Sequence, residues 1–253
     1  MINIIIQPKG GVGKSTFSNQ IISAYYFNKT GKKIKLIEID DENSDNLSLS
    51  KTEIMECSII KTQDIKKIDE IFFNDEDIII DIGGNKTATI FLNEYKKVNE
   101  FDDVIFWIPL GAGEQDNINA LETYNNIKSM NSEANIAFVL SRATSTDLEW
   151  EFLNFFGNEF LNTNFAIKKQ IPNADFVVIK AKEIINNARY FGKTVYDLSL
   201  NQTDFRQKAK EEEDKSKRSK YIFMNRVKNE AIEYVEDLKS NTFPKIEEIL
   251  EKI

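Results

Sequence analysis

The chain has 253 residues, of which 41% are hydrophobic and 29% charged, and its formal net charge is −8. This composition is typical of a soluble globular protein without a membrane-spanning run. The net negative charge argues against a surface that is basic throughout, so nucleic acid or anionic lipid could bind only at a local basic patch. The sequence has no histidine and a single cysteine, which excludes histidine-based triads, typical histidine zinc sites and an internal disulfide; with no signal peptide at the N-terminus, we expect a cytoplasmic protein.

Short β-branched runs alternate with longer helical patterns over the first 200 residues. Runs that are apolar almost throughout predict strands buried on both faces, and they lie at Ile2–Gln7, Ile34–Ile39, Ile78–Ile82, Val104–Ile108, Ile136–Leu140 and Phe165–Ile171. The segments between them predict helices at about 15–29, 64–73, 86–98, 116–129, 146–162 and 173–190. This alternation predicts an α/β fold, a doubly wound and mostly parallel sheet flanked by helices, with its ligand at the carboxyl ends of the strands.

The pattern changes near residue 201, after which no further strand is expected. One apolar face of a long helix is formed by Phe223, Val227, Ala231, Tyr234 and Leu238. We expect Asn241–Pro244 to break that helix, because proline does not fit a helix interior, and residues 245–253 to form a last short helix. The predicted organisation is therefore a domain over residues 1–200 and a helical C-terminal extension over 201–253.

A glycine-rich loop follows the first predicted strand and leads into the first predicted helix. Glycines let successive backbone N–H groups turn inward around an anion, and the following helix adds the positive end of its dipole. Lys14 would reach the β- and γ-phosphates of a nucleotide, and the Ser15 hydroxyl would be a ligand of Mg²⁺. Because Pro8 replaces the first glycine of the ordinary phosphate-loop pattern, the pattern that fits is Lys-Gly-Gly-x-Gly-Lys-Ser. The plain alternative is a glycine-rich turn.

This loop resembles the deviant Walker A motif of the ParA/MinD family of ATPases. The resemblance extends over about residues 1–200 and implies a P-loop ATPase that uses ATP and Mg²⁺. It also implies an ATP-dependent homodimer in which Lys9 reaches the partner's nucleotide; the alternative for Lys9 is a solvated loop lysine. The implied nucleotide contacts in the loop are Lys9, Gly10, Gly11, Val12, Gly13, Lys14, Ser15 and Thr16.

Acidic residues after the second and third predicted strands continue the resemblance. Asp40 matches the family's acid that positions the attacking water, and Glu38 stands where the family has an aspartate near the metal, although its side chain is one methylene longer. For Asp40 and Glu38 the other interpretation is that each only ends a strand. Asp81, followed by Gly83-Gly84, resembles a Walker B acid that holds Mg²⁺ through water, with the two glycines as a γ-phosphate sensor. The implied catalytic residues are Lys9, Lys14 and Asp40, and the implied metal-site residues are Ser15, Asp81 and Glu38.

Ile108-Pro109 and Ile171-Pro172 resemble the family's later strand-to-helix junctions, and the position after the strand Ile136–Leu140 corresponds to residues that read the base. Ser141-Arg142 stands where the family has an Asn-Arg that reads adenine, and Pro172 belongs to the second junction. A hydroxyl offers one rotatable donor, whereas an amide offers a donor and an acceptor together. ATP is therefore implied, and the strict choice between ATP and GTP stays open.

Differences between this sequence and particular members of the family exclude some of the family's functions. Cys57 alone excludes the relatives that need cysteine clusters, namely the nitrogenase iron protein and the arsenite pump ATPase, and the acidic residues 245–253 do not resemble the basic membrane helix of MinD. What remains is a slow ATPase that acts as a switch in plasmid partition or cargo positioning, stimulated by a cargo adaptor or a centromere-binding protein. The alternatives are the conjugation-associated TraL/StbB type and an ATP-dependent small-molecule ligase on the same fold.

A basic stretch in the extension leaves two interpretations open. It follows the acidic run Glu211–Asp214 and contains Lys215, Lys217, Arg218, Lys220, Arg226 and Lys228. One interpretation is a solvated helix docked on the core. The other is a weak DNA-binding strip, independent of sequence, whose phosphate contacts double when ATP brings two copies together.

Overall fold

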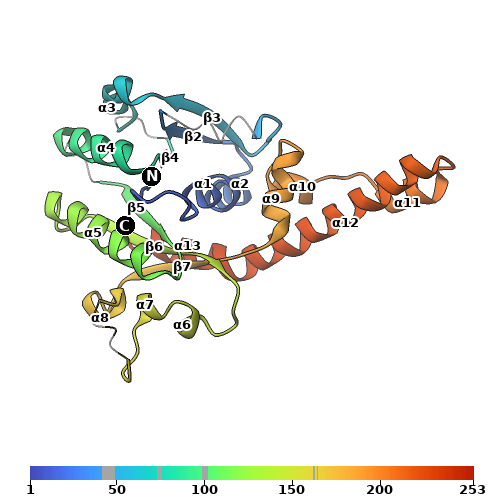
Figure 1. Cartoon of the computed structure of the whole chain (residues 1–253). Helices are drawn as coiled ribbons and strands as arrows, with labels where there is room; N and C mark the ends of the chain where they lie inside the picture. Colours follow the sequence, from blue (N-terminus) through green and yellow to red (C-terminus); the bar gives the residue numbers. More distant parts are fainter. Residues whose placement is uncertain (42–48, 73–75, 99–101, 162, 164) are drawn as a thin grey trace.

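A seven-stranded parallel sheet forms the centre of the computed structural model, which describes residues 1–41, 49–72, 76–98, 102–161, 163 and 165–253 (Figure 1). The strand order is β3-β2-β4-β1-β5-β6-β7, and every neighbouring pair is parallel. The strands are β1 (Ile2–Ile5), β2 (Ile34–Ile39), β3 (Met55–Ile60), β4 (Ile78–Ile82), β5 (Val104–Leu110), β6 (Asn135–Ala143) and β7 (Asp175–Lys180). The predicted α/β fold class is confirmed.

Helices cover both faces of the sheet. One face packs against α1 (Lys14–Thr16), η1 (Phe17–Ile22), α2 (Ser23–Thr30), α9 (Glu183–Tyr190), α10 (Val195–Ser199), α12 (Lys215–Asp237), η4 (Leu238–Thr242) and α13 (Phe243–Leu250). The other packs against η3 (Thr62–Lys67), α3 (Ile68–Phe72), α4 (Asn85–Val98), α5 (Glu114–Met130), α6 (Leu148–Glu151), α7 (Leu153–Phe156) and α8 (Ile167–Gln170). Successive strand residues alternate between the faces, as when Ile4 joins one apolar cluster and Ile5 the other. Both faces are buried, which is why the strands read as continuous apolar runs.

The predictions for the central strands are confirmed, and those for the two edges of the sheet are wrong. The predicted strand Phe165–Ile171 is an irregular segment with the short helix α8, and the predicted helix 173–190 contains β7 before α9. The edge strand β3 was not predicted. Edge strands are covered on fewer sides, so β3 is largely exposed and its sequence, Met-Glu-Cys-Ser-Ile-Ile, lacks the apolar run of a central strand.

Two helix predictions also differ from the structure. The helix expected over 146–162 is two single turns, α6 and α7, separated at Phe152, whose backbone (φ −103°, ψ 44°) is not helical. The break expected at Asn241–Pro244 is absent, because η4 is a π-helical turn that leads directly into α13, with Pro244 in the first turn of α13. Proline has no N–H to donate, and it stands here directly after the change from π to α geometry, where the regular ladder of helical hydrogen bonds is already interrupted.

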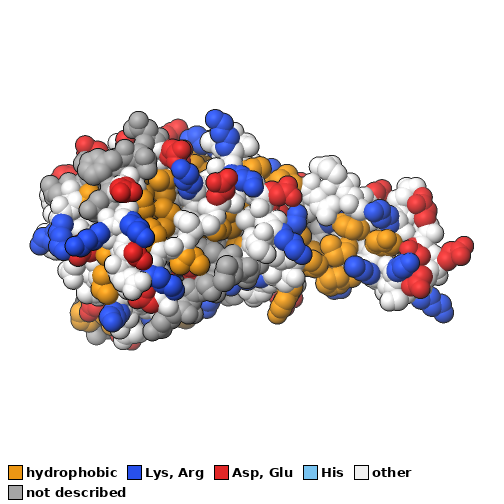
Figure 2. All heavy atoms as spheres, turned by 90° about the horizontal axis from the view of Figure 1, so that it is seen from above, with side chains coloured by type: hydrophobic (Ala, Val, Ile, Leu, Met, Phe, Trp, Pro, Cys, Tyr) orange, Lys and Arg blue, Asp and Glu red, His pale blue; other side chains and the backbone are white. Residues whose placement is uncertain are grey.

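The extension divides into a packed part and a protruding part. From Val227 onward, α12 and α13 contribute buried side chains to the same apolar cluster as α2 and β6. The first half of α12 extends beyond the sheet together with α11 (Phe205–Glu211), and we call this hairpin the arm (Figure 1). Basic, acidic and apolar side chains are interspersed over the arm (Figure 2), including the exposed Ile222 and Phe223. Among the described residues, no helix is both long and apolar enough to cross a membrane.

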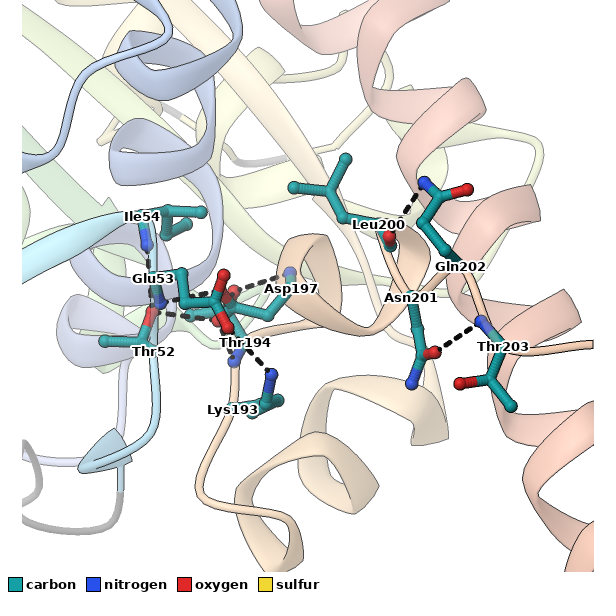
Figure 3. Close-up of polar contacts among 10 residues, drawn as sticks. All are labelled: Thr52, Glu53, Ile54, Lys193, Thr194, Asp197, Leu200, Asn201, Gln202 and Thr203. Atoms are coloured by element: carbon teal, nitrogen blue, oxygen red, sulfur yellow. Dashed lines mark hydrogen bonds and ion pairs between the residues drawn. The ribbon is translucent and has the colours of Figure 1, made fainter.

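A buried carboxylate ties α10 to the segment that precedes β3 (Figure 3). Asp197 accepts hydrogen bonds from the backbone N–H and the hydroxyl of Thr194 (2.8 and 2.6 Å). The first of these bonds and the bond from the Asp197 N–H to the Thr194 hydroxyl (3.1 Å) form the capping box of α10. It also accepts from the Thr52 hydroxyl and the Glu53 N–H, both at 2.8 Å. On the other side of α10, the Val195 N–H donates to the Gln20 side chain at 2.8 Å, in the helix that follows the glycine loop. Thus α10 joins the outer strands to that helix.

We predict that Asp197→Ala lowers the free energy of unfolding by about 2–4 kcal/mol, because four donors, two of them buried, lose their acceptor. Denaturant unfolding measures the change. The control is Asp204→Ala, which removes an exposed helix cap with a single bond to the Gln207 N–H and should cost about 1 kcal/mol. Equal losses for the two variants would contradict the anchoring role of Asp197.

Candidate functional site

The glycine-rich loop lies between β1 and α1 at the carboxyl edge of the sheet. Gly11 (φ 75°) and Gly13 (φ 99°) have the left-handed backbone that glycine adopts without a steric penalty. Gly13 is also the N-cap of α1, so the loop N–H groups and the positive end of a continuous helix, α1-η1-α2, meet at one place. This is the geometry of an anion-binding loop.

Ser141 packs directly against this loop. A Cβ added at Gly13 would lie 2.7 Å from Ser141 Oγ and 3.0 Å from Ser141 Cβ. Ser141 is buried near the end of β6, just before a register shift that accompanies the positive φ of Arg142 (63°). The sequence therefore places a small side chain where the loop comes closest to the sheet.

Lys14 is folded back over the loop. Its Nζ donates to the backbone oxygens of Gln7 (2.9 Å) and Lys9 (3.1 Å), and the side chain is buried. Burial lowers the pKa of Lys14, while the charges of Asp81 and Asp40 oppose that shift. The buried ammonium of Lys14 can bind an anion such as a phosphate. The two carboxylates beside it favour an anion that is accompanied by a cation.

The three acids expected at the site lie together. Register pairs Glu38 of β2 with Asp81 of β4, and both are buried; Asp40 follows β2 and is buried as well. All three line one cavity of about 770 Å³, together with the glycine loop, Lys14 and Ser15. The arginines Arg142 and Arg189 also line it, and Arg189 of α9 was not predicted, because no motif marks it.

The segment after β4 contacts both the loop and the end of β2. The Gly83 N–H donates to Ile39 O (2.8 Å), and the Asn85 N–H donates to Pro8 O (2.6 Å). A Cβ added at Gly83 would lie 2.8 Å from the Asp40 carboxylate. Glycine is therefore required for this segment to pass so close to Asp40.

The oxygen donors at the cavity fit Mg²⁺ bound with a nucleotide. This hard ion takes one or two carboxylates and a hydroxyl together with phosphate oxygens and water, and Asp81, Glu38 and Ser15 all line the cavity. The sequence did not mark Ser18, whose hydroxyl donates to Asp81 Oδ2 at 2.8 Å.

Lys9 lies apart from this cluster. Its Nζ forms an ion pair with Asp116 near the N-terminus of α5, and 39% of its side chain is exposed. It lines a neighbouring groove on α5 rather than the 770 Å³ cavity. The two lysines of the motif therefore have separate surroundings.

A second cavity, of about 330 Å³, adjoins the loop beside Ser141 and Arg142, the two residues expected at the nucleotide base. It is lined on the loop side by Gly13, Thr16 and Phe17 and on the β6 side by Ser141 and Arg142. The end of β7 and the segment after it contribute Ile179, Lys180, Ala181, Lys182, Glu183, Ile185 and Asn186. The prediction for Pro172 is wrong, because Pro172 precedes β7 and lies at the amino end of the parallel sheet. Identification of β7 in the sequence would have pointed to residues 180–182 instead.

The basic stretch of the extension lies on α12. Arg226 pairs with Glu230 (3.3 Å), and the Lys228 Nζ donates to Thr203 O (3.1 Å). The other four cations, which lie on the arm, are exposed: Lys215, Lys217, Arg218 and Lys220.

Comparisons with known proteins found no family model and no curated protein that matches the chain. Among solved structures, it is similar to an ATP complex of a Cyanothece McdA variant (14% identity, TM-score 0.49, 78% of this chain and 89% of that chain). It is also similar to a putative plasmid partition protein from Borrelia burgdorferi bound to AMPPNP (17% identity, TM-score 0.47, 74% of this chain and 89% of that chain). At these values the likeness carries no inference about activity.

We predict that Gly13→Ala lowers the affinity for a fluorescent ATP analogue at least about tenfold, because a strained φ and the contact with Ser141 both displace the loop. The control is Gly31→Ala, which has a comparable φ (67°) with no atom near the added Cβ. It should lose about 1 kcal/mol of stability and keep its affinity. Unchanged binding by Gly13→Ala would contradict the anion-binding role of the loop.

Proposed function

We propose that this protein is an ATPase of the deviant Walker A type that works as a molecular switch. It binds ATP with Mg²⁺, dimerises around the nucleotide and hydrolyses it slowly, and it positions plasmid DNA or another cargo with a partner protein that stimulates hydrolysis. The observation that carries the proposal is the meeting of the Lys9–Ser15 loop with three buried acids at one 770 Å³ cavity.

Each group at the cavity has a role that follows from its place. The loop N–H groups and Lys14 bind the phosphates, and Ser15 and Asp81 would hold the metal, with Glu38 beside them. Bound Mg²⁺ would offset phosphate charge. Asp40 is held against Gly83, so it can accept a proton from, and orient, a water near the terminal phosphate. The Gly83–Asn85 segment, bonded to both β2 and the loop, would respond to that phosphate.

The role of Lys9 requires a second copy. Within one chain its ammonium is directed to Asp116, outside the phosphate cavity. In a dimer that faces its two cavities toward each other, an exposed lysine at the mouth of the loop would lie nearest the partner's nucleotide. A cation there offsets charge on the transferred phosphoryl group, as an arginine finger does.

Direct DNA binding is a further part of the proposal. The arm holds Lys215, Lys217, Arg218 and Lys220 in exposed positions, and two arms in one dimer would bind a duplex without regard to sequence. Arg226 and Lys228 contribute less, because each already has a partner within the chain.

Two substitutions should separate binding from hydrolysis. Lys14→Ala should weaken ATP binding about 100-fold, because the phosphates lose their main counter-charge.

Asp40→Ala should bind ATP within about twofold of wild type and lose at least about 100-fold in turnover, because it affects only the transition state. Calorimetry and phosphate release measure these effects, with Asp41→Asn as the neighbouring-acid control. Near-native ATP binding by Lys14→Ala would contradict the proposed function.

The dimer is tested by Lys9→Ala. With ATP and Mg²⁺ the wild type should change from monomer to dimer. Lys9→Ala should bind ATP yet stay monomeric, because too little positive charge would lie between the two triphosphates to offset their repulsion. Light scattering measures the mass, and Lys33→Ala, an exposed lysine before β2, is the control. A nucleotide-dependent dimer of Lys9→Ala with wild-type affinity would remove the cross-dimer role.

A further inference from the structure

A hydroxyl one helical turn behind the phosphate loop is bonded to the acid expected at the metal site. Ser18 and Ser15 are three residues apart, so they share one side of the helix that follows the loop. Ser15 lines the phosphate cavity. Ser18 is fully buried, and its Oγ donates to Asp81 Oδ2 at 2.8 Å. None of the roles described for the loop uses Ser18.

The backbone at Ser18 is held by an unusual turn. The helix widens to π geometry over Phe17–Ile22, and the N–H of Ser23 donates to the Ser18 carbonyl. The Ser23 hydroxyl donates to the same carbonyl at 2.6 Å. Two donors on one carbonyl hold Ser18 in place, and π turns occur frequently at functional sites.

The strand that carries Asp81 is equally constrained. Asp81 lies on β4 between β1 and β2, in register with Ile5 and Glu38, and the helix containing Ser18 contacts β4. A carboxylate can still rotate about its last side-chain bond. A fixed donor on Oδ2 removes that freedom and defines the direction of the other oxygen.

We propose that Ser18 is a positioning residue, which orients the Asp81 carboxylate for the metal of a bound metal–nucleotide without touching the metal. The inference rests on the proposed function, because it assigns Ser18 to the same nucleotide site. Groups that orient a metal ligand in this way commonly change metal affinity by 10- to 100-fold when they are removed. Ser18→Ala should therefore weaken metal binding while the contacts of the loop with phosphate persist.

The test compares two buried hydroxyls of the same turn. Ser18→Ala removes the bond to Asp81, whereas Ser23→Ala removes a bond to backbone only. Ser18→Cys, nearly isosteric with a weak donor, is the graded variant. Electron paramagnetic resonance of Mn²⁺ measures its affinity for the full-length protein saturated with AMPPNP. Fluorescence measures nucleotide affinity in EDTA, and thermal unfolding checks that each variant is folded.

We expect the Mn²⁺ Kd of Ser18→Ala to rise about tenfold, that of Ser18→Cys to be intermediate, and that of Ser23→Ala to stay within about twofold of wild type. Nucleotide affinity in EDTA should change less than about twofold in all three. Equal Mn²⁺ affinity for Ser18→Ala and wild type, or equal losses for Ser18→Ala and Ser23→Ala, would overturn the inference alone. A wild type that binds neither AMPPNP nor Mn²⁺–AMPPNP would overturn the proposed function as well.

Discussion

Parallel pairing of β1, β4 and β2 is the constraint on which the candidate site depends. It sets Ile5 beside Asp81 and Asp81 beside Glu38, so the glycine loop and two buried acids lie together at the carboxyl ends of the strands. A slip of one residue would turn Asp81 to the opposite face and bring an isoleucine to the cavity, since strand residues alternate in direction. Both faces are buried under helices, and the apolar residues around Asp81 therefore hold the register.

Positive charge at the loop is divided between two environments. Lys14 is buried and donates to two backbone oxygens of its own loop, where Asp81 and Asp40 favour its charged form. Lys9 is partly exposed and held by Asp116 on α5. The pair is only partly exposed, at 39% for the Lys9 side chain and 16% for that of Asp116, so a stronger anion has to offset the loss of Asp116 as partner. The loop thus holds Lys14 inside the phosphate cavity and Lys9 outside it.

The C-terminal helices link the outer parts of the molecule to the site. Packing of α12 and α13 against α2 supports the helix that follows the loop, and Asp197 connects α10 to the segment before β3. Lys180, which lines the base-side cavity at the end of β7, pairs with Asp237 of α12 at 2.7 Å. The C-terminal end of the helix that carries the arm is therefore in direct contact with a wall of that cavity.

Local patterns in the sequence predicted the central strands and the glycine loop, from continuous apolar runs and from glycines beside a Lys-Ser pair. The acids Glu38, Asp40 and Asp81 were implied by the family resemblance, and the structure brings them to one cavity. The edge strand β3 escaped prediction because its exposed sequence lacks an apolar run, whereas the apolar run 176–179 of β7 fell inside a predicted helix. The second junction was therefore expected at Pro172, which lies at the other end of the sheet. Nothing in the sequence indicated the π turn that precedes Pro244 and keeps the helix continuous. The sequence also did not mark Arg189 or Ser18, because neither belongs to a motif. Three contacts depend on the packed fold: the bond from Ser18 to Asp81, the close approach of Ser141 to Gly13 and the ion pair of Lys9 with Asp116. Those contacts join residues distant in the chain, and they exist only after the strands have paired and the helices have packed on both faces of the sheet.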